Sequence, residues 1–454
     1  MKSWTRTIVC PNQKIRTTSL VLLVAFLVTA AILFVLVPNM GRFFAYRYSA
    51  HFVDGYDLIA SNLASGNGYR WQAGMGETMI REPGYPLFLA AVFKIAGYHI
   101  EAARFANWLL TIGIAWMIMR LTKMVTNDGG AALVASLLFL FHPGVLIAEA
   151  RGGVEILSIF VALVFMLVLY RAVEKGNPWR YFVAGLVLGI VIQVRSTPLA
   201  FPALLLVYLC WTANSARERL RAIVNVATLV LGTAMVMMPW IMRNYMLVQK
   251  FVPTATVLGL AVQEGQYASQ HLSFRRDYYA VQDEAGRERS DLATKLGLRF
   301  EGVYYYQVFY EARDEWGFYN GLLQRAEKTY VEHPSLLASC VGKNLFNFWF
   351  LGKTWTVTCL NMVIQVPVIV LALSGLHLLR KRGQLHRMGM MLTFALTIMF
   401  VTLPVIAAAR YSIPVVAFLA IPASLSVLSM WHRCWAQGRT EAAPASSSIP
   451  QASC

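Results

Sequence analysis

The chain has 454 residues, of which 57% are hydrophobic and only 14% are charged, and its mean hydropathy is +0.53. Because about a quarter of the residues in soluble domains are charged, this composition excludes a soluble globule and predicts an all-α protein that crosses a membrane many times. The net charge is +17. The basic residues are dispersed over short loops, which favours contact with an anionic membrane surface over a nucleic-acid partner.

Apolar runs that can cross a bilayer recur along the chain and predict about ten spans, two of them short. They occupy residues 19–37, 105–125, 131–148, 156–173, 181–194, 198–211, 222–240, 356–379, 388–407 and 411–430. Loops rich in Lys and Arg mark the cytoplasmic side of a membrane protein. We therefore expect both chain termini in the cytoplasm, with the protein integral to a bacterial inner (plasma) membrane and its active site facing outward.

Two long polar segments fall on the opposite side from the basic loops. The predicted order is a cytoplasmic N-terminus (1–18), a first span (19–37), a first outer segment (38–104), a multi-span core (105–244), a second outer segment (245–355), C-terminal spans (356–430) and a disordered cytoplasmic tail (431–454). The outer segments are expected to cap a cavity that faces lipid. The aromatic run at 303–310 is interpreted as core of the second segment or as an interfacial belt, in preference to a platform for stacking sugars.

Five arginines lie where the predicted spans meet the outer side. Arg81, Arg195, Arg243 and Arg410 each border an apolar run, and Arg151 lies in a short link between two runs. A lone arginine at such an edge often does no more than extend to the headgroups. A group of them can bind an anionic lipid headgroup, because guanidinium pairs with phosphate oxygens in bidentate geometry.

Short motifs accompany these arginines in a fixed order. Asp54 follows the first span, and then come an A-x-x-L-x-x-G-x-G-Y stretch at 60–69, an R-x-P-G-Y-P corner at 81–86, a W-x-x-R-N-Y passage at 240–245 and an R-Y-x-x-P element at 410–414. The set resembles the C superfamily of glycosyltransferases (GT-C). The closer resemblance is to its bacterial branch similar to dolichyl-phosphate-mannose protein mannosyltransferases and aminoarabinose lipid A transferases, which is glycosyltransferase family 39-like.

This resemblance implies a GT-C-like helical bundle and a hexosyl- or pentosyltransferase. Its donor would be a polyprenyl-phosphate sugar in the bilayer, its acceptor an outer lipid, glycan or protein, and its reaction an inversion at the anomeric carbon. It also implies that Arg81, Arg195, Arg243 and Arg410 hold the donor phosphate and that Tyr85 and Tyr411 line the donor or acceptor pocket. Arginines fixed around the phosphate would stabilise the charge that develops as the glycosidic bond breaks.

A carboxylate is the expected proton acceptor for the attacking hydroxyl. Asp54 occupies the acidic position of the family and is the predicted catalytic residue, with Asp57 and Glu155 as secondary candidates. Glu155 can equally be an ion-pair partner of Arg151, and His142 is expected to be a packed core histidine. No cofactor follows with certainty. A divalent metal is possible, although Asp54 and Asp57 are three residues apart and form no Asp-x-Asp pair.

Two other functions share some of these features. A transporter or flippase of an anionic lipid-linked precursor would also need outer arginines, but it predicts ionisable residues near the middle of spans, whereas here they cluster at the ends. A polysaccharide polymerase or ligase would also carry a large outer segment, but its expected donor is linked through pyrophosphate.

Overall fold

The computed structural model describes residues 11–37, 53–273, 277–303 and 306–441. The predicted apolar runs lie on the helices α1 (Pro11–Ala31) with η1 (Ile32–Leu36), α5 (Ile100–Thr126), α6 (Gly129–Leu140) with α7 (Pro143–Ala150), α8 (Val154–Lys175), α9 (Pro178–Val194), η3 (Thr197–Ala200) with α10 (Phe201–Thr212), α11 (Ala216–Val248), α16 (Trp355–Lys381), η4 (Leu385–Met388) with α17 (Gly389–Thr402), and η5 (Ala409–Ser412) with α18 (Ile413–Glu441). The run predicted at 388–407 was too long, because α17 ends at Thr402. The predicted all-α membrane bundle is confirmed.

Length and hydropathy separate these helices into classes. Seven helices of the described chain are long and apolar enough to span a membrane, and α6 with α7, bent by 51°, makes an eighth if the pair is one span. The bend follows from sequence, because Pro143 cannot continue α6 and His142 caps α7 by accepting from the Gly144 amide at 3.1 Å. Helices α9 and α10 are shorter, so the count of ten stays a prediction.

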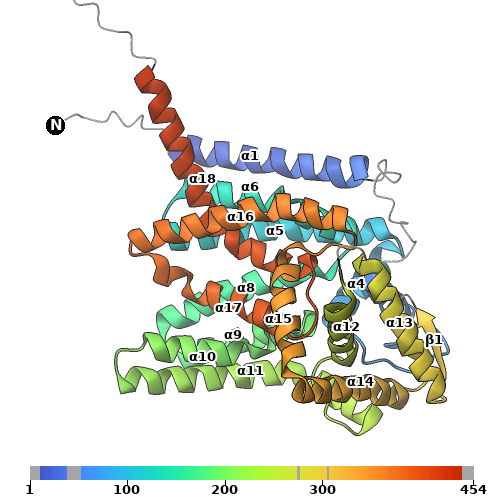
Figure 1. Ribbon diagram of the computed structural model, residues 1–454. Helices are drawn as coiled ribbons and strands as arrows, with labels where there is room; N and C mark the ends of the chain where they lie inside the picture. The colour runs from blue at the N-terminus through green and yellow to red at the C-terminus, as the bar shows by residue number, and fades with distance from the viewer. Residues whose placement is uncertain (1–10, 38–52, 274–276, 304–305, 442–454) are drawn as a thin grey trace, which may run out of the picture.

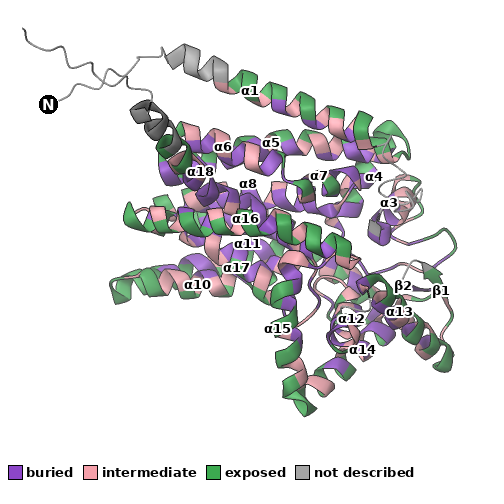
Figure 2. Cartoon of the chain, turned by 45° about the horizontal axis from the view of Figure 1, so that its top comes forward, coloured by how far each residue is buried: buried purple, intermediate pink, exposed green. Residues whose placement is uncertain are grey.

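The spans pack side by side, as Figure 1 shows. Helices α9 and α11 approach so closely that a Cβ on Gly185 would lie 2.0 Å from the Leu229 carbonyl oxygen, and glycine is therefore required at that crossing. Figure 2 shows exposed residues along the outer faces of α1, α10 and α16, and many of them are large and apolar, such as Leu23, Val207 and Val363. An apolar outer surface of this kind faces lipid in an integral membrane protein.

Both outer segments lie at one end of the bundle, the right-hand end in Figure 1. The first contains η2 (Val53–Gly55), α3 (Tyr56–Ala64) and the apolar α4 (Gly84–Ala96). The second contains α12 (Val257–His271), α13 (Tyr278–Lys295), the antiparallel strands β1 (Phe300–Val303) and β2 (Tyr306–Phe309), α14 (Ala312–Glu332) and α15 (Pro334–Phe350). Helix α11 continues four residues past the predicted boundary at 244, and α18 extends into the predicted tail as far as Glu441.

The outer segments share one hydrophobic core. Trp71 and Ile80 of the first segment pack with Tyr306, Phe309 and Tyr319 of the second. Residues 306–309 of the aromatic run are therefore core, one of the two expected placements, while positions 304 and 305 lie outside the described residues.

A buried carboxylate joins the same two segments. Glu315, in the first turn of α14, accepts hydrogen bonds from the Met79 amide at 2.8 Å, from the Thr78 hydroxyl and from the Thr256 hydroxyl at 2.9 Å. Burial raises the pKa of Glu315 above its usual value, although these hydrogen bonds act in the opposite direction. The loop that carries Arg81 is thus fixed to α12 and α14.

Candidate active site

The backbone at Asp54 is held in an unusual conformation. Asp54 has φ 76° and Gly55 has φ 70°, so two successive residues are left-handed before α3 begins at Tyr56. A non-glycine residue with positive φ is uncommon, and such residues cluster at functional sites. Gly55 is required on a second ground, because a Cβ there would lie 2.1 Å from a ring carbon of Trp71. The packing of Trp71 against Gly55 thereby fixes the direction in which the Asp54 side chain points.

The Asp54 carboxylate brings two of the predicted arginines together. One oxygen lies 2.8 Å from Nη1 of Arg410, and the other lies 3.5 Å from its Nη2 and 4.0 Å from Nη2 of Arg81. Asp54 is only 8% exposed, whereas the Arg410 side chain is 35% exposed. A carboxylate that is separated by 356 residues from its main partner thus becomes the centre of the site.

Arg81 is fixed on all sides. It donates to the Asp54 carbonyl oxygen at 3.1 Å and to the Tyr306 hydroxyl. Its guanidinium lies 4.8 Å from the ring centroid of Tyr56 and 4.7 Å from that of Tyr306, which are favourable cation–π distances. The guanidinium therefore has little freedom to move, and a ligand would meet it in a preset position.

Arg195 lies beside this pair. Its guanidinium lies 4.8 Å from the Tyr411 ring, on which Arg410 also packs at 5.3 Å, and its Nη1 is 3.7 Å from Glu155. Of the two interpretations of Glu155, the ion pair is observed, but with Arg195 as its partner. Glu82, which sequence analysis overlooked, accepts from the Ser196 amide at 3.2 Å and joins the Arg195 turn to the Arg81 corner.

Arg243 has different partners from the other three. It contacts Glu77 at 3.2 Å and the Thr78 carbonyl oxygen at 3.0 Å, and it packs on the rings of Tyr69 and Trp240 at 5.1 and 4.6 Å. Its link to the Asp54 cluster is indirect, because the hydroxyl of Tyr69 donates to the carbonyl oxygen of Arg81 at 3.0 Å. This geometry suits a residue that positions the Arg81 corner.

Lys353 is a further cation of the site that sequence analysis missed. Its loop is held between η5 and α13, because the Leu351 carbonyl accepts from the Ala409 amide at 3.0 Å and the Lys353 carbonyl accepts from the Tyr279 amide at 3.2 Å. Burial lowers the pKa of Lys353 to about 8, with Arg151 and Arg410 acting in the same direction and Asp54 in the opposite one. A lysine just before a span gives no sequence signal beyond that of a headgroup contact.

The remaining candidates, Asp57 and Tyr85, are buried, and the Tyr85 ring lies 5.2 Å from that of Tyr56, on which Arg81 packs. Asp57 is 0% exposed and accepts from the Tyr98 hydroxyl at 2.7 Å, so the two aspartates have different partners. Tyr85 is fully buried and donates to the Gly152 carbonyl oxygen, next to Arg151. Among the described residues, no three His, Cys, Asp or Glu side chains gather in a metal-binding group.

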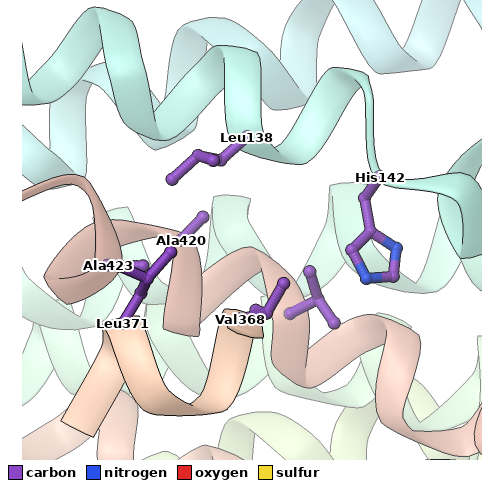
Figure 3. Close-up of a pocket in the computed structure, with 7 residues that line it drawn as sticks. Leu138, His142, Val368, Leu371, Ala420 and Ala423 are labelled. Carbon is purple, nitrogen blue, oxygen red and sulfur yellow. The ribbon is translucent and has the colours of Figure 1, made fainter. Parts of the chain in front are cut away.

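His142 is buried, as expected for a core histidine. Figure 3 shows it at one end of a small cavity between α6, α16 and α18, whose other lining residues include Leu138, Val368 and Ala420. The cavity measures about 20 Å³, which is little more than one water requires. It has no room for a sugar.

Residues 81–242 match the family of dolichyl-phosphate-mannose-protein mannosyltransferases. The matched segment contains Arg81, Glu155 and Arg195, and it ends one residue before Arg243. No curated protein matches the chain.

Three solved structures show partial similarity. ArnT from Cupriavidus metallidurans bound to undecaprenyl phosphate is 12% identical over 92% of this chain and 78% of that chain, with a TM-score of 0.37. Its apo state is 14% identical over 91% and 78%, with a TM-score of 0.34. Arabinosyltransferase EmbB from Mycobacterium smegmatis is 14% identical over 100% of this chain and 47% of that chain, with a TM-score of 0.30.

These TM-scores are all below 0.5, so the solved structures carry no argument, and the family match is limited to residues 81–242. The match covers the corner that presents Arg81 and the turn that presents Arg195. Over residues 81–242 the chain is thus similar to this family of membrane glycosyltransferases, in agreement with the resemblance carried by the ordered motifs.

Proposed function

We propose that the protein transfers a sugar from a polyprenyl-phosphate donor to an acceptor on the outer face of a bacterial inner membrane, with inversion at the anomeric carbon. The observation that carries the proposal is the convergence of Arg81 and Arg410 on Asp54, with Arg195 and Lys353 beside them. The excess of positive charge in this cluster suits a phosphate. The ArnT structure that contains undecaprenyl phosphate agrees with a lipid phosphate as the ligand.

The cluster suggests how donor binding and proton transfer are coupled. Asp54 is the anion that pairs with Arg410 and Arg81 in the structure. A donor phosphate offers the same guanidiniums oxygens of its own. When the phosphate takes Arg410, the Asp54 carboxylate is released toward the acceptor hydroxyl and is free to act as the base.

The proposed reaction is a single displacement. The acceptor oxygen bonds to the anomeric carbon, the bond from that carbon to the phosphate oxygen breaks, and Asp54 takes the hydroxyl proton. The arginines stabilise the charge that appears on the departing polyprenyl phosphate. Arg81 is the best placed to do so without moving, because Tyr56 and Tyr306 fix it. The nature of the acceptor, whether lipid, glycan or protein, is left to the outer segments.

The test uses purified protein in lipid nanodiscs with polyprenyl-phosphate sugars. Release of free polyprenyl phosphate should require the native chain and be lost in Asp54→Asn. Asp283→Asn is the matched control, because Asp283 is a 65% exposed carboxylate on α13 that contacts only Arg287 among the described ion pairs. If no donor yields polyprenyl phosphate, and a labelled lipid-linked precursor instead changes leaflet in vesicles, the protein is a transporter and the proposal fails.

A further inference from the structure

The loop that follows α16 carries a dense group of cations. Within residues 380–387 the exposed basic side chains are Arg380, Lys381, Arg382, His386 and Arg387. The sequence contains no Asp or Glu between Glu332 and Glu441, and no ion pair among the described residues includes any of these five side chains. The positive charge of this 380–387 loop is therefore not neutralised within the described chain and is open to an anionic partner.

The 380–387 loop is fixed to three other helices. The Tyr170 hydroxyl of α8 donates to the Arg387 carbonyl oxygen, and the Tyr208 hydroxyl of α10 donates to the His386 carbonyl oxygen at 3.4 Å. Nη1 of Arg387 donates to the Val125 carbonyl oxygen of α5 at 3.5 Å. The cations are thus held over one place on the bundle instead of on a free tether, which lowers the ordering cost of binding a ligand.

An apolar stripe of α16 leads directly to these cations. The exposed side chains of the stripe are Val363, Val366, Val370 and Leu373. Their spacing of three and four residues places them on one face of the helix, and the same spacing continues to His377 and Arg380, which are also exposed. An acyl chain that lies along the stripe would therefore place its headgroup at Arg380.

The length of α16 brings the 380–387 loop to the level of the lipid headgroups. The helix has 27 residues and is about 40 Å long at about 1.5 Å per residue, while a bilayer with its headgroups is about 40–45 Å thick. Because α16 begins next to Lys353 of the candidate active site, the loop lies at the other end of the bundle, the left-hand end in Figure 1. Tryptophan favours the headgroup region, and exposed tryptophans occur on the ends of α9, α10 and α18 that lie away from the active site, at Trp179, Trp211 and Trp431.

Two simpler roles do not account for the whole arrangement. Arg380 and Lys381 in the last turn of α16 complement the negative end of the helix dipole, and basic loops help to orient a membrane protein. Neither role requires the loop to be fixed across α5, α8 and α10. The start of α11, at the same end of the bundle, differs in that Arg217, Arg219 and Arg221 share their turn with Glu218.

We propose that the 380–387 loop and the adjoining stripe of α16 form a binding site for an anionic phospholipid of the leaflet at this end of the bundle. The lipid phosphate contacts Arg380, Lys381 and Arg382, since guanidinium and ammonium groups bind phosphate oxygens through charge-assisted hydrogen bonds. One acyl chain lies along Val370 and Leu373. The site is remote from the Asp54 cluster, and it does not depend on the proposed sugar transfer.

The test measures the binding of dioleoyl phosphatidylglycerol and dioleoyl phosphatidylcholine to the full-length protein in detergent by native mass spectrometry. One variant combines Arg380→Gln, Lys381→Gln and Arg382→Gln. The matched control combines Arg217→Gln, Arg219→Gln and Arg221→Gln, which remove the same charge at the same end of the bundle. The native protein should bind the first phosphatidylglycerol about tenfold or more tighter than phosphatidylcholine. The 380–382 variant should lose most of this preference, and the 217–221 control should keep it.

Equal binding of the two lipids to the native protein overturns the proposal, and so does an equal loss in the 380–382 variant and the 217–221 control, which would show a response to total charge alone. Displacement of phosphatidylglycerol by millimolar glycerol phosphate would also overturn it, because the site would then be one for soluble phosphates. If the 380–382 variant does not fold, Lys381→Gln replaces it and should weaken phosphatidylglycerol binding about twofold or more. Asp54→Asn should bind this lipid like the native protein, so a failure of the catalytic assignment and a failure of the lipid site can be told apart.

Discussion

Replacing Asp54 with asparagine removes one negative charge from the point where two guanidiniums converge, and it should change turnover and donor affinity in opposite directions. The amide keeps the size of the carboxylate but cannot accept the proton of the acceptor hydroxyl. General-base catalysis contributes about 10²–10⁴-fold, so kcat should fall by that factor. The left-handed turn at Asp54 and Gly55 tolerates asparagine well, and the fold should be retained.

The effect on donor affinity follows from the contacts of the carboxylate. Asp54 makes a charge-assisted hydrogen bond to Arg410 at 2.8 Å, and bonds of this kind contribute about 1.5–3 kcal/mol. A phosphate that displaces the carboxylate must replace this bond. Asp54→Asn lacks this charge-assisted bond, so its donor Kd should fall by about tenfold or more, since 1.4 kcal/mol corresponds to a factor of ten.

The assay compares native protein, Asp54→Asn and Asp57→Asn, with donor binding and polyprenyl phosphate release measured on the same nanodisc samples. Asp57 accepts from Tyr98 and is fully buried, so Asp57→Asn should lower the Tm clearly and have only a small effect on kcat. Near-normal turnover in Asp54→Asn would refute Asp54 as the base. A weaker donor affinity in that variant would refute the exchange of the carboxylate for the phosphate.

Four further outcomes are expected. Arg410→Ala should raise the donor Kd about tenfold or more, whereas Arg243→Ala should mainly lower the Tm, because its contacts lie within the first outer segment and α11. Lys353, with a pKa lowered to about 8, loses its proton above that pH. Donor affinity measured from pH 6 to 10 should therefore be constant below pH 8 and fall up to tenfold per pH unit above it. A constant affinity in native protein, or the same decrease in Lys353→Arg, would exclude a role for Lys353 in donor binding. Gly55→Ala should lower the Tm and abolish turnover, because its Cβ would overlap Trp71; a normal Tm would show that the ring can move.

Hydropathy was sufficient to place the apolar helices, because the bilayer requires long apolar runs and most of each run lies on a helix. The outer arginines could also be identified from the sequence, because Lys and Arg are enriched on the cytoplasmic side and are unusual at the opposite ends of the spans. What the sequence could not give was their pairing. Asp54 and Arg410 are 356 residues apart in the sequence and meet only in the folded chain, and no local pattern encodes such a contact.

The buried polar residues were the least predictable. Glu315 occurs in a charged helical stretch that is typical of solvated surface, and Glu264 is the only acidic or basic residue of α12 apart from His271. The fold encloses both carboxylates with hydroxyl or amide donors. The lowered pKa of Lys353 could not be predicted from the sequence either, because Arg151 and Arg410, which contribute to it, are distant along the chain. Arg243 shows the converse, since its motif is clear but its observed partners are Glu77 and Thr78.

The contacts of Glu315 bear on how the specificity of such an enzyme can be changed by exchanging parts between relatives. A chimera that imports a foreign second outer segment would bring its own residue at position 315 to meet the native Thr78 and the Met79 amide. A mismatch would leave a buried carboxylate or a buried amide without its partner and destabilise the Arg81 corner. Position 78 therefore has to be transferred together with positions 256 and 315, even though it lies far outside the exchanged segment.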